Sequence, residues 1–460
     1  MIKNLINAPE LPKINMVRGW VRTHRQSKSV SFFDLNDGTS IKGLQVVIAP
    51  ETKGYQEVAA KITTGASVIV LGEMKDSPAK GQRYEFHASE VRLIGESDAE
   101  NYPLQKKGHT LEFLREHLHL RPRSNTFGAI ARIRSRAAFA VHQYFQDRDF
   151  YYLTSPIIST SDCEGAGAMF RVTTFDLDKV PLTSDKKVDY SKDFFGEEAS
   201  LTVSGQLEGE AYATAISKIY TFGPTFRAEN SNTTRHLAEF WMIEPEMAFY
   251  ELKDNQELAQ DFVLYLIKDV LKNCDEELRF LQEREWTSND HIEVLQKVSE
   301  SKFETVDYTE AIKILEKSKT SFEFPVSWGI DLQSEHERFL TDEHFKGPVT
   351  VINYPKEIKA FYMRLNEDEK TVRAMDVLVP RLGEIIGGSQ REERFDVLLQ
   401  KMKAQDLDPN KYSWYLDLRR FGTVPHSGFG LGFERFLMYV TGMQNIRDVI
   451  PFPRYPGSAK

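Results

Sequence analysis

The chain has 460 residues, of which 41% are hydrophobic and 28% charged, so a largely disordered protein is excluded and two or three globular domains are expected. Its net charge of −9 argues against indiscriminate binding to nucleic acids, although a local basic surface could still bind one. The two cysteines, Cys163 and Cys274, lie far apart and in no CxxC or His-rich pattern, which argues against a disulfide framework or a zinc site. This cysteine usage and the lack of a long apolar run predict a cytoplasmic protein with no signal peptide and no membrane-spanning segment.

The pattern of residues 15–95 predicts a small β-barrel. Short strand-like runs are separated by turn residues, and one helical stretch lies between the third and fourth runs. This is the element order of an OB-fold, although other small barrels would give a similar pattern. Phe32 and Phe33 are adjacent, so one ring should enter the core while the other stays outside, where it could stack on a flipped base or simply pack on the surface. Gln45 and Glu85 interrupt apolar strands and could hydrogen-bond a base edge.

We predict domain boundaries at residues 1–100 for the barrel, 101–124 for a hinge and 125–460 for a second domain. The hinge could contact phosphates or could be only a solvated connector, and its basic side chains are Lys106, Lys107, Arg121 and Arg123. Apolar residues at helical spacing predict a helix over residues 125–148, which leads to Pro156 in the sequence TSPIIST.

Residues 222–247 predict two strands joined by a polar loop at residues 230–234. The strand ends carry many charged and aromatic residues, namely Arg227, Glu229, Arg235, His236, Glu239, Phe240, Trp241, Glu244 and Glu246. A guanidinium can bind a phosphate with two hydrogen bonds, a carboxylate can accept from an exocyclic amine, and an aromatic face can stack on a purine. The hairpin therefore has the groups needed to bind ATP, although an ion-paired hairpin with an aromatic core side would show the same pattern.

Two later stretches differ in how much chemistry they carry. Charge-rich helices predicted over about 250–345 contain no recognisable site. A following strand contains Gly387 and Gly388, which would let a ligand approach the backbone. Glu384 and Arg391 are seven residues apart on this strand, so a bulge at the glycines is expected to bring them to one face; otherwise both are exposed charges on an edge strand.

The sequence SGFGLGFERFLMYVTG predicts a glycine-rich strand that enters a helix near Glu434 and ends at Gly442. Arg435 lies in the first helical turn, where a positive charge opposes the helix dipole, so a phosphate or an acidic partner is expected beside it. The glycines fit neither GxGxxG nor GxxxxGK[ST]. The sequence therefore supports neither a dinucleotide-binding fold nor a P-loop.

Three of these motifs resemble a known family. FRAE…RHLAEF at 226–240 and FGLGFERF at 429–436 resemble motifs 2 and 3 of the class II aminoacyl-tRNA synthetases, and TSPIIST at 154–160 resembles the end of motif 1. Together with the barrel, the pattern resembles the aspartate/asparagine/lysine subgroup, and in detail the asparagine-specific enzymes, over nearly the whole chain. The resemblance implies an α+β fold, in which an OB-fold anticodon-binding barrel precedes a catalytic domain with an antiparallel sheet flanked by helices. It also implies a homodimer whose interface includes Pro156.

The resemblance implies that the protein attaches asparagine to its tRNA through an asparaginyl-adenylate. The implied ATP-binding residues are Arg227, Glu229, His236, Phe240, Glu384, Gly432 and Arg435. Three of them would be catalytic: Arg227 at the α-phosphate, Arg435 at the γ-phosphate, and Glu384 at the Mg²⁺ ion of ATP. Phe240 would stack on adenine and Glu229 would bind its amino group. Such a reaction depends on positioning and charge neutralisation, and the sequence has no Ser/His/Asp or Cys/His constellation for a protein nucleophile.

The implied amino-acid pocket contains Ser204, Gln206, Glu244 and Arg391, with Gln206 expected in a loop ahead of a helix. Glu244 would accept from the amide NH2 and repel a carboxylate, whereas Arg391 would donate to the amide oxygen. The aspartate enzymes have a lysine three residues after the glutamine, where this chain has Gly209. A misplaced charge in a dry pocket costs several kcal/mol, so asparagine is expected over aspartate.

In the barrel, Phe32, Gln45 and Glu85 stand where the subgroup binds the central uridine of the anticodon. The implied partners are the asparagine tRNA, ATP, L-asparagine and a second copy of the chain, with Mg²⁺ but no zinc and no membrane. One alternative is an aspartyl-tRNA synthetase, either specific for its own tRNA or also charging asparagine tRNA, which Gly209 argues against. The other is a non-enzymatic OB-fold nucleic-acid-binding protein, which Arg227, Glu384 and Arg435 argue against.

Overall fold

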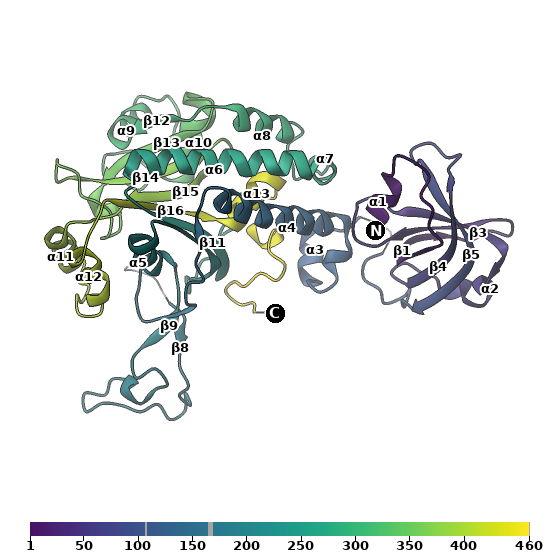
Figure 1. The fold of residues 1–460 in the computed structure, drawn as a ribbon, viewed down its shortest axis with the longest axis horizontal. Helices are drawn as coiled ribbons and strands as arrows, with labels where there is room; N and C mark the ends of the chain where they lie inside the picture. The colour runs from purple at the N-terminus through teal and green to yellow at the C-terminus, as the bar shows by residue number, and fades with distance from the viewer. Residues whose placement is uncertain (106–107, 164–168, 460) are drawn as a thin grey trace. The chain divides into compact units, whose positions relative to one another are not determined.

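The computed structural model describes residues 1–105, 108–163 and 169–459. It divides into two compact units, one formed by residues 1–132 with 279–281 and the other by the rest of the chain (Figure 1). The two units are described separately below. Lys106 and Lys107 of the predicted hinge lie outside the described residues.

A closed five-stranded barrel with strand order β1-β2-β3-β5-β4 forms the first unit (Figure 1). Its strands are β1 (Met16–Arg25), β2 (Ser31–Asn36), β3 (Leu44–Lys53), β4 (Ser67–Asp76) and β5 (Tyr84–Gly95). The short helices are α1 (Ile2–Ile6), α2 (Tyr55–Val58) and α3 (Leu111–Glu116). Alternate apolar residues of the strands fill the interior, as a side-chain period of two requires. The closure, and the position of α2 between β3 and β4, confirm the predicted OB-fold.

The second unit is built on an eight-stranded sheet with the order β12-β13-β14-β15-β16-β11-β10-β6 (Figure 1). Its strands are β6 (Tyr151–Tyr152), β10 (Lys218–Phe226), β11 (Glu239–Ala248), β12 (Glu304–Asp307), β13 (Val349–Pro355), β14 (Thr371–Val379), β15 (Gly383–Gln390) and β16 (His426–Gly432). Neighbouring strands are antiparallel except at β12–β13 and β6–β10, so the predicted antiparallel sheet is confirmed. A separate small sheet contains β7 (Ile158–Ser159), β8 (Arg171–Val172) and β9 (Ala199–Leu201).

Helices flank the large sheet. They are α4 (Asn125–Gln146), α5 (Gln206–Ile216), α6 (Leu252–Asn273), α7 (Asp275–Gln282), α8 (His291–Glu300), α9 (Tyr308–Glu316), α10 (Ser334–Arg338), α11 (Phe395–Ala404), α12 (Ser413–Arg420) and α13 (Phe433–Thr441). On β10, Ile219 faces α5, while Tyr220 stacks on Phe145 of α4 with ring centroids 4.6 Å apart. Adjacent strand residues point to opposite faces, so α4 and α5 cover opposite faces of β10. The long helix α6 packs on β14, β15 and β16 (Figure 1).

The structure differs from the sequence-based expectations at three places. The stretch over 250–345 is not only helical, because β12 adds a parallel edge strand beside β13. Gln206 begins helix α5 instead of lying in a loop ahead of it. The irregularity of β15 lies between Glu384 and Ile386, where the register with β14 shifts, and not at the glycine pair that follows. Among the described residues, no helix has both the length and the apolar character needed to cross a membrane.

Candidate ATP and amino-acid site

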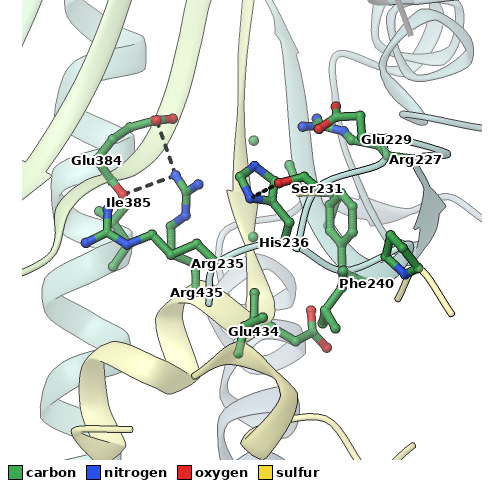
Figure 2. Close-up of a pocket in the computed structure, with 16 residues that line it drawn as sticks. Arg227, Glu229, Ser231, Arg235, His236, Phe240, Glu384, Ile385, Glu434 and Arg435 are labelled. Carbon is green, nitrogen blue, oxygen red and sulfur yellow. Dashed lines mark hydrogen bonds and ion pairs between the residues drawn. The ribbon is translucent and has the colours of Figure 1, made fainter. Parts of the chain in front are cut away.

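A pocket in the second unit brings together all seven residues predicted to bind ATP (Figure 2). It encloses about 210 Å³, and its lining includes Arg227, Glu229, His236, Phe240, Glu384, Gly432 and Arg435. These residues come from three parts of the chain: the β10–β11 hairpin, the start of β15 and the junction of β16 with α13. The sheet order places these parts side by side, since β11 and β15 both pair with β16. Each residue's role toward ATP stays a prediction.

The hairpin forms one wall of the pocket. The strands β10 and β11 pair from Lys218 opposite Met247 to Phe226 opposite Glu239, so Arg227 follows directly after the last pair. The guanidinium carbon of Arg227 lies 5.3 Å from the centroid of the Phe240 ring, a distance at which a cation is attracted to an aromatic face. One guanidinium and one aromatic face are thus held together at the end of the hairpin, as binding of a nucleotide would require.

Polar contacts inside the connecting loop hold His236. Its ring Nδ1 lies 3.2 Å from the Ser231 hydroxyl (Figure 2). The same nitrogen also contacts the Thr233 hydroxyl. The backbone N–H of Arg227 donates to the Ala238 carbonyl oxygen at 3.0 Å, which closes the base of the loop. The loop is therefore folded back on itself beside the pocket.

The opposite wall carries an ion pair between Glu384 and Arg435. The Arg435 Nη1 donates to the Glu384 carboxylate at 3.2 Å and to its carbonyl oxygen at 3.3 Å (Figure 2). Burial alone would raise the pKa of Glu384, but Arg435 and Lys359 outweigh burial and hold this pKa below its usual value. Both side chains remain partly exposed, at 37% and 38%, so a ligand in the pocket can reach them.

The position of Arg435 is set by its neighbour Glu434. The Glu434 side chain is 1% exposed, accepts from the Trp241 backbone N–H at 2.9 Å, and lies 2.7 Å from the Arg134 guanidinium. Burial raises the pKa of Glu434, and the contact with Arg134 opposes this change. The first turn of α13 is thereby tied to β11, and Arg435 in this turn points toward Glu384 across the pocket (Figure 2).

The residues predicted to bind the amino acid are all buried next to one another, but Glu244 already has protein partners. Its carboxylate accepts from the Ser204 hydroxyl, from the Gly205 backbone N–H at 2.9 Å and from the Thr221 hydroxyl at 3.0 Å. The Ser204 hydroxyl in turn accepts from the Gln206 N–H at 3.1 Å. In this structure Glu244 therefore holds the turn that starts α5. Its predicted contact with the substrate amide stays a prediction.

Glu246, two residues further along β11, is the partner of Arg391. The Arg391 Nε donates to Glu246 Oε2 at 3.1 Å, its Nη2 donates to Oε1, and its Nη1 donates to the Ser389 hydroxyl at 2.9 Å. The two side chains are 3% and 0% exposed. Burial opposes the charge of Arg391, but Glu246 and Glu210 outweigh burial and raise its pKa. From the sequence, Glu246 is only one of the charged hairpin residues, and its spacing from Glu244 shows only that both point to the same face of β11.

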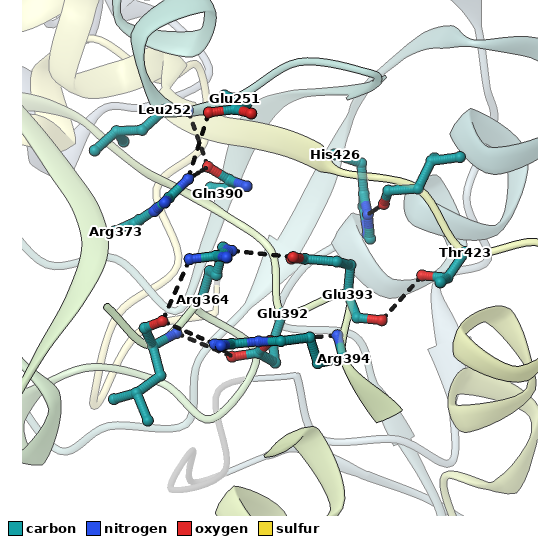
Figure 3. Close-up of polar contacts among 12 residues, drawn as sticks. Glu251, Leu252, Arg364, Arg373, Gln390, Glu392, Glu393, Arg394, Thr423 and His426 are labelled. Carbon is teal, nitrogen blue, oxygen red and sulfur yellow. Dashed lines mark hydrogen bonds and ion pairs between the residues drawn. The ribbon is translucent and has the colours of Figure 1, made fainter. Parts of the chain in front are cut away.

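Hydrogen bonds on both sides of Arg391 lock the end of β15 (Figure 3). The Gln390 side chain accepts from Arg373 at 2.8 Å and from the Leu252 backbone N–H at 3.2 Å. Glu392 accepts from the Arg394 Nε at 2.7 Å and from the backbone N–H of Leu365. The direction of the Arg391 side chain is thus determined by contacts from three other parts of the chain.

A second buried carboxylate, that of Glu210, lies one helical turn after Gln206 on α5. It accepts from Arg419 at 2.7 Å, from the Tyr415 hydroxyl at 2.8 Å and from the Gln206 amide at 3.0 Å, and His426 lies at 2.9 Å. Burial would raise the pKa of Glu210, but Arg419 and His426 outweigh burial and lower it. The side chain of Gln206 is therefore oriented by a carboxylate that is itself paired with Arg419 of α12 and contacts His426 of β16.

Gly209 and Gly428 leave the space that Glu246 occupies. A Cβ atom at position 209 would lie 3.3 Å from Glu246 Cγ and 3.2 Å from Ile219 Cδ1. A Cβ atom at position 428 would lie 2.1 Å from Glu246 Oε1, which no side chain allows. A lysine at position 209 would thus have to displace its neighbours, and its ammonium would compete with Arg391 for Glu246.

The three residues predicted to bind an anticodon share the outer face of the barrel. Phe33 is 1% exposed in the core, so the adjacent Phe32 points outward. The pairing of Phe32 with Val47, and the parallel pairing of Val46 with Phe86, place Gln45 and Glu85 on the same face. The Gln45 amide donates to the Glu85 carboxylate at 3.3 Å.

Glu85 is held by further contacts on this face. Its carboxylate accepts from the Ser77 hydroxyl at 3.0 Å, and the His87 ring lies 2.8 Å away. A carboxylate with this many fixed contacts presents its remaining acceptor positions in a defined direction.

Pro156 lies on an exposed and partly apolar stretch. The strand β6 is an edge of the eight-stranded sheet, and its Tyr151 and Tyr152 are 61% and 45% exposed. Ile157 and Ile158, directly after Pro156, are 45% and 40% exposed. Contiguous exposed apolar residues of this kind mark interaction surfaces.

In the described part of the chain, no group of three or more His, Cys, Asp or Glu side chains could hold a metal ion by itself. Glu384 nevertheless fits a magnesium ion that arrives with a nucleotide, because Mg²⁺ is commonly held by one or two carboxylates together with phosphates and water. The fit rests on the partly exposed, ionised carboxylate that faces the pocket.

Two family models match the chain. Residues 110–456 match the tRNA synthetases class II (D, K and N), and residues 16–94 match the OB-fold nucleic acid binding domain. A protein from Treponema denticola named asparagine–tRNA ligase is 57% identical, with 100% of this chain and 99% of that protein covered. A protein of the same name from Thermosynechococcus vestitus is 55% identical over the same shares.

Solved structures are similar over nearly the full length. The asparaginyl-tRNA synthetase from Pyrococcus horikoshii, complexed with asparaginyl-adenylate, has a TM-score of 0.85 and 32% identity, and 99% of this chain and 98% of that chain are covered. The asparaginyl-tRNA synthetase from Entamoeba histolytica, also in complex with asparaginyl-adenylate, has a TM-score of 0.82 and 26% identity, with 99% and 98% covered. A putative aspartyl-tRNA synthetase from Leishmania major shares the fold at 22% identity, with a TM-score of 0.79 and 99% and 94% covered.

Proposed function

This chain belongs to the class II tRNA synthetases of the D, K and N type, and from that premise we propose that it charges tRNA with asparagine through an asparaginyl-adenylate. The observation that carries the proposal is the single pocket in which the hairpin wall, with Arg227 and Phe240, faces Glu384 and Arg435. The full-length relatives named asparagine–tRNA ligase support the same activity.

In the first step, an oxygen of the asparagine α-carboxylate attacks the α-phosphorus of ATP, and the bond to pyrophosphate breaks. Arg227 stabilises the charge that develops on the α-phosphate, and Phe240 orients the adenine by stacking. Arg435 binds the γ-phosphate and so holds the leaving group in line. No proton moves in this step, because the carboxylate is already ionised. The protein therefore acts by positioning and by electrostatic stabilisation, without a nucleophile of its own.

Glu384 is the residue that would hold a magnesium ion at this site. The ion, when bound with ATP, neutralises charge on the phosphates. In this structure Glu384 is the ion-pair partner of Arg435. If Glu384 bound the magnesium ion in place of Arg435, the Arg435 guanidinium would be available to bind a phosphate.

In the second step, a ribose hydroxyl at the 3′ end of the tRNA attacks the carbonyl carbon of the adenylate. The bond from that carbon to the phosphate oxygen breaks, AMP leaves, and the phosphate of the leaving AMP takes up the hydroxyl proton. The barrel supplies recognition at the other end of the tRNA. Phe32 stacks on an anticodon base, while Gln45 and Glu85 hydrogen-bond its edge. The shared outer face of these three residues supports this assignment.

The preference for asparagine over aspartate follows from charges that are already balanced. Arg391 is neutralised by Glu246, so it can donate to an amide oxygen but does not offer an unpaired cation to a carboxylate. A substrate carboxylate would also stand close to Glu246 and Glu244 without a lysine at position 209 to offset them. An unbalanced charge in such a buried pocket costs several kcal/mol, which is enough for discrimination on the order of 10³.

We also propose a cytoplasmic homodimer. The exposed apolar residues around Pro156 and along the edge strand β6 support a second copy as the partner at this surface. A cytoplasmic location agrees with the two cysteines, which are buried and far apart in the sequence, and with the need for ATP and tRNA.

The proposed function is tested by ATP–pyrophosphate exchange with the purified protein, run separately with asparagine, aspartate and lysine. We expect exchange with asparagine alone, followed by charging of asparagine tRNA. Exchange with aspartate would keep the reaction but overturn the specificity and favour an aspartyl-tRNA synthetase. If none of the three amino acids supports exchange, a non-enzymatic nucleic-acid-binding protein becomes the better explanation.

A further inference from the structure

The helix α10 lies in the charge-rich stretch over 250–345 in which the sequence showed no chemistry, yet it reaches both walls of the ATP pocket. Near its beginning, the Ser334 hydroxyl accepts from the guanidinium of Arg235, a pocket residue at the end of the hairpin loop. One helical turn later, the Glu337 carboxylate accepts from the backbone N–H of Glu384 at 3.0 Å. Two residues that are three apart lie on the same side of a helix, so one short element can make both contacts.

The backbone conformation of Gly383 leaves room for the contact of Glu337 with β15. Gly383, which precedes Glu384, has a φ of 88°, a conformation that favours glycine. A Cβ atom at Gly383 would lie 2.3 Å from Glu337 Oε2, so the carboxylate fills the space beside this residue. Glu337 therefore determines where the strand that carries Glu384 begins.

The turn before Glu384 has two more anchors in the same stretch. The backbone N–H of Arg381 donates to Asp342 at 2.9 Å, and the Arg381 guanidinium forms an ion pair with Asp290 at 2.5 Å. The turn between β14 and β15 is thus held from outside the sheet by three acidic residues.

On the hairpin side, α10 contacts Arg235, which lies close to two other arginines, Arg435 and Arg338. Burial and the nearby charges of Arg435 and Arg338 lower the pKa of Arg235, whereas Glu337 opposes this change. Arg235 and Arg435 both line the pocket (Figure 2). Guanidinium groups held this close favour a ligand with several negative charges, and the hydroxyl of Ser334 keeps one of them in place.

We propose that α10 is part of the ATP site, in which Glu337 positions Glu384 and Ser334 positions Arg235. This inference deepens the proposed function and rests on it. It assigns positioning roles, because neither Glu337 nor Ser334 lines the pocket in which ATP would lie. The stretch over 250–345 is then a support for nucleotide binding and not only a scaffold at the edge of the sheet.

The test compares Glu337→Ala, Glu337→Gln and Ser334→Ala in the full chain, and Ser334→Ala is also combined with Arg235→Ala, which is made alone as well. The control is Glu343→Ala, which removes an exposed carboxylate close to α10. The dissociation constant of ATP is measured by calorimetry, and KM for ATP and for asparagine by pyrophosphate exchange. Thermal unfolding is followed in parallel.

We expect Glu337→Ala to raise both the dissociation constant and KM of ATP about tenfold, with KM of asparagine unchanged. The reason is that Glu384 would move from the position in which it contributes to ATP binding. Glu337→Gln should stay within about threefold of the parent because its amide oxygen still accepts from the Glu384 N–H. Ser334→Ala should raise KM of ATP about threefold and should add nothing when Arg235 is already replaced by alanine. Glu343→Ala should match the parent.

An unchanged ATP affinity in Glu337→Ala would overturn the proposal. So would equal increases in KM for ATP and asparagine together with a lower melting temperature, which would indicate a general loss of structure. If the parent protein binds ATP but catalyses no exchange, the proposed function fails, and the calorimetric order of the variants still decides the roles of Glu337 and Ser334. A parent protein that does not bind ATP would overturn both.

Discussion

The pocket proposed for ATP and the buried residues proposed to bind asparagine share strands of one sheet but use charge in opposite ways. In the first, Glu384 and Arg435 are each more than one third exposed and lie 3.2 Å apart. In the second, Arg391 with Glu246 and Arg419 with Glu210 are between 0% and 3% exposed, and each charge has an opposite charge in contact. The first site is thus open and ready to exchange partners, and the second is neutralised before any ligand arrives.

The difference follows from the ligands. ATP brings its own negative charges, so the protein needs accessible cations that can leave one partner for another. The side chain of asparagine is polar but neutral, so a free charge in its pocket would remain unbalanced after binding. Specificity for a neutral side chain therefore requires that the buried charges of the pocket be paired with one another.

The largest effect is expected from Arg391→Ala. This change leaves the Glu246 carboxylate buried without its ion-pair partner, which typically costs about 3–5 kcal/mol of unfolding free energy. Asparagine-dependent exchange should be lost as well. Both are measured on the purified variant, by denaturant unfolding and by pyrophosphate exchange.

Arg420→Ala is the matched control, because Arg420 pairs with Asp417 at the surface, where both side chains are about half exposed. An exposed pair of this kind contributes less than about 1 kcal/mol. Equal losses of stability in Arg391→Ala and Arg420→Ala would show that burial of the Arg391–Glu246 pair has no special effect on stability.

Arg227→Ala tests the open site. Removing a group that stabilises transition-state charge typically lowers turnover by about 10²–10³-fold, and the exchange rate should fall by that factor. The unfolding free energy should fall by about 1 kcal/mol, the size of the lost cation–π contact with Phe240. Lys253→Ala, at an exposed position on α6, serves as the control for loss of a positive charge. A large loss of stability in Arg227→Ala would show that its side chain acts mainly in the fold.

Phe32→Ala extends the comparison to the barrel. Base stacking on an aromatic side chain is worth about 1–3 kcal/mol, so KM for tRNA should rise about 10- to 100-fold while exchange in the absence of tRNA stays unchanged. Replacing the exposed Trp20 on β1 by alanine provides an aromatic control in the same barrel. If exchange without tRNA falls in Phe32→Ala, the residue does not act through tRNA.

The smallest effect is expected from Lys401→Met. This change tests the cost of burying a charge whose ammonium contacts a carbonyl oxygen, in contrast to the paired charges of Arg391 and Glu246. Burial lowers the pKa of Lys401 to about 8, and its ammonium donates to the neutral carbonyl oxygen of Met363. The pKa of the folded state lies below that of the unfolded state, so the penalty for the charged form is fully present below pH 8 and disappears as the pH rises to about 10.5.

We therefore expect the free energy of unfolding at pH 7 to be about 1 kcal/mol higher in the methionine variant than in the parent. Removing the buried charge stabilises the variant, and loss of the hydrogen bond to Met363 offsets part of this gain. The advantage should shrink toward pH 10.5 in denaturant unfolding at the two pH values. An advantage that stays constant with pH would show that the charge of Lys401 carries no penalty in the folded protein.

The sequence by itself determined the fold class and a set of residues that line one pocket of the second unit, the pocket proposed for ATP. Alternation along β2 required that one of Phe32 and Phe33 point outward, and the strand and turn chemistry of residues 222–247 required a hairpin with its charges at the open end. These features depend on local backbone geometry. A residue's type and its spacing from its neighbours are enough to predict them.

Only the tertiary structure decided which charges neutralise one another. Glu244 and Glu246 share a face of β11, and their spacing could not tell which of them meets Arg391; the register with β16 and the turn into α5 assign Glu246 to that role. Likewise, Glu337 reaches Glu384 from a helix with no recognisable motif. The physical reason is that periodicity determines the face on which a side chain lies, whereas an ion pair depends on distance, burial and strand register between segments far apart in the chain.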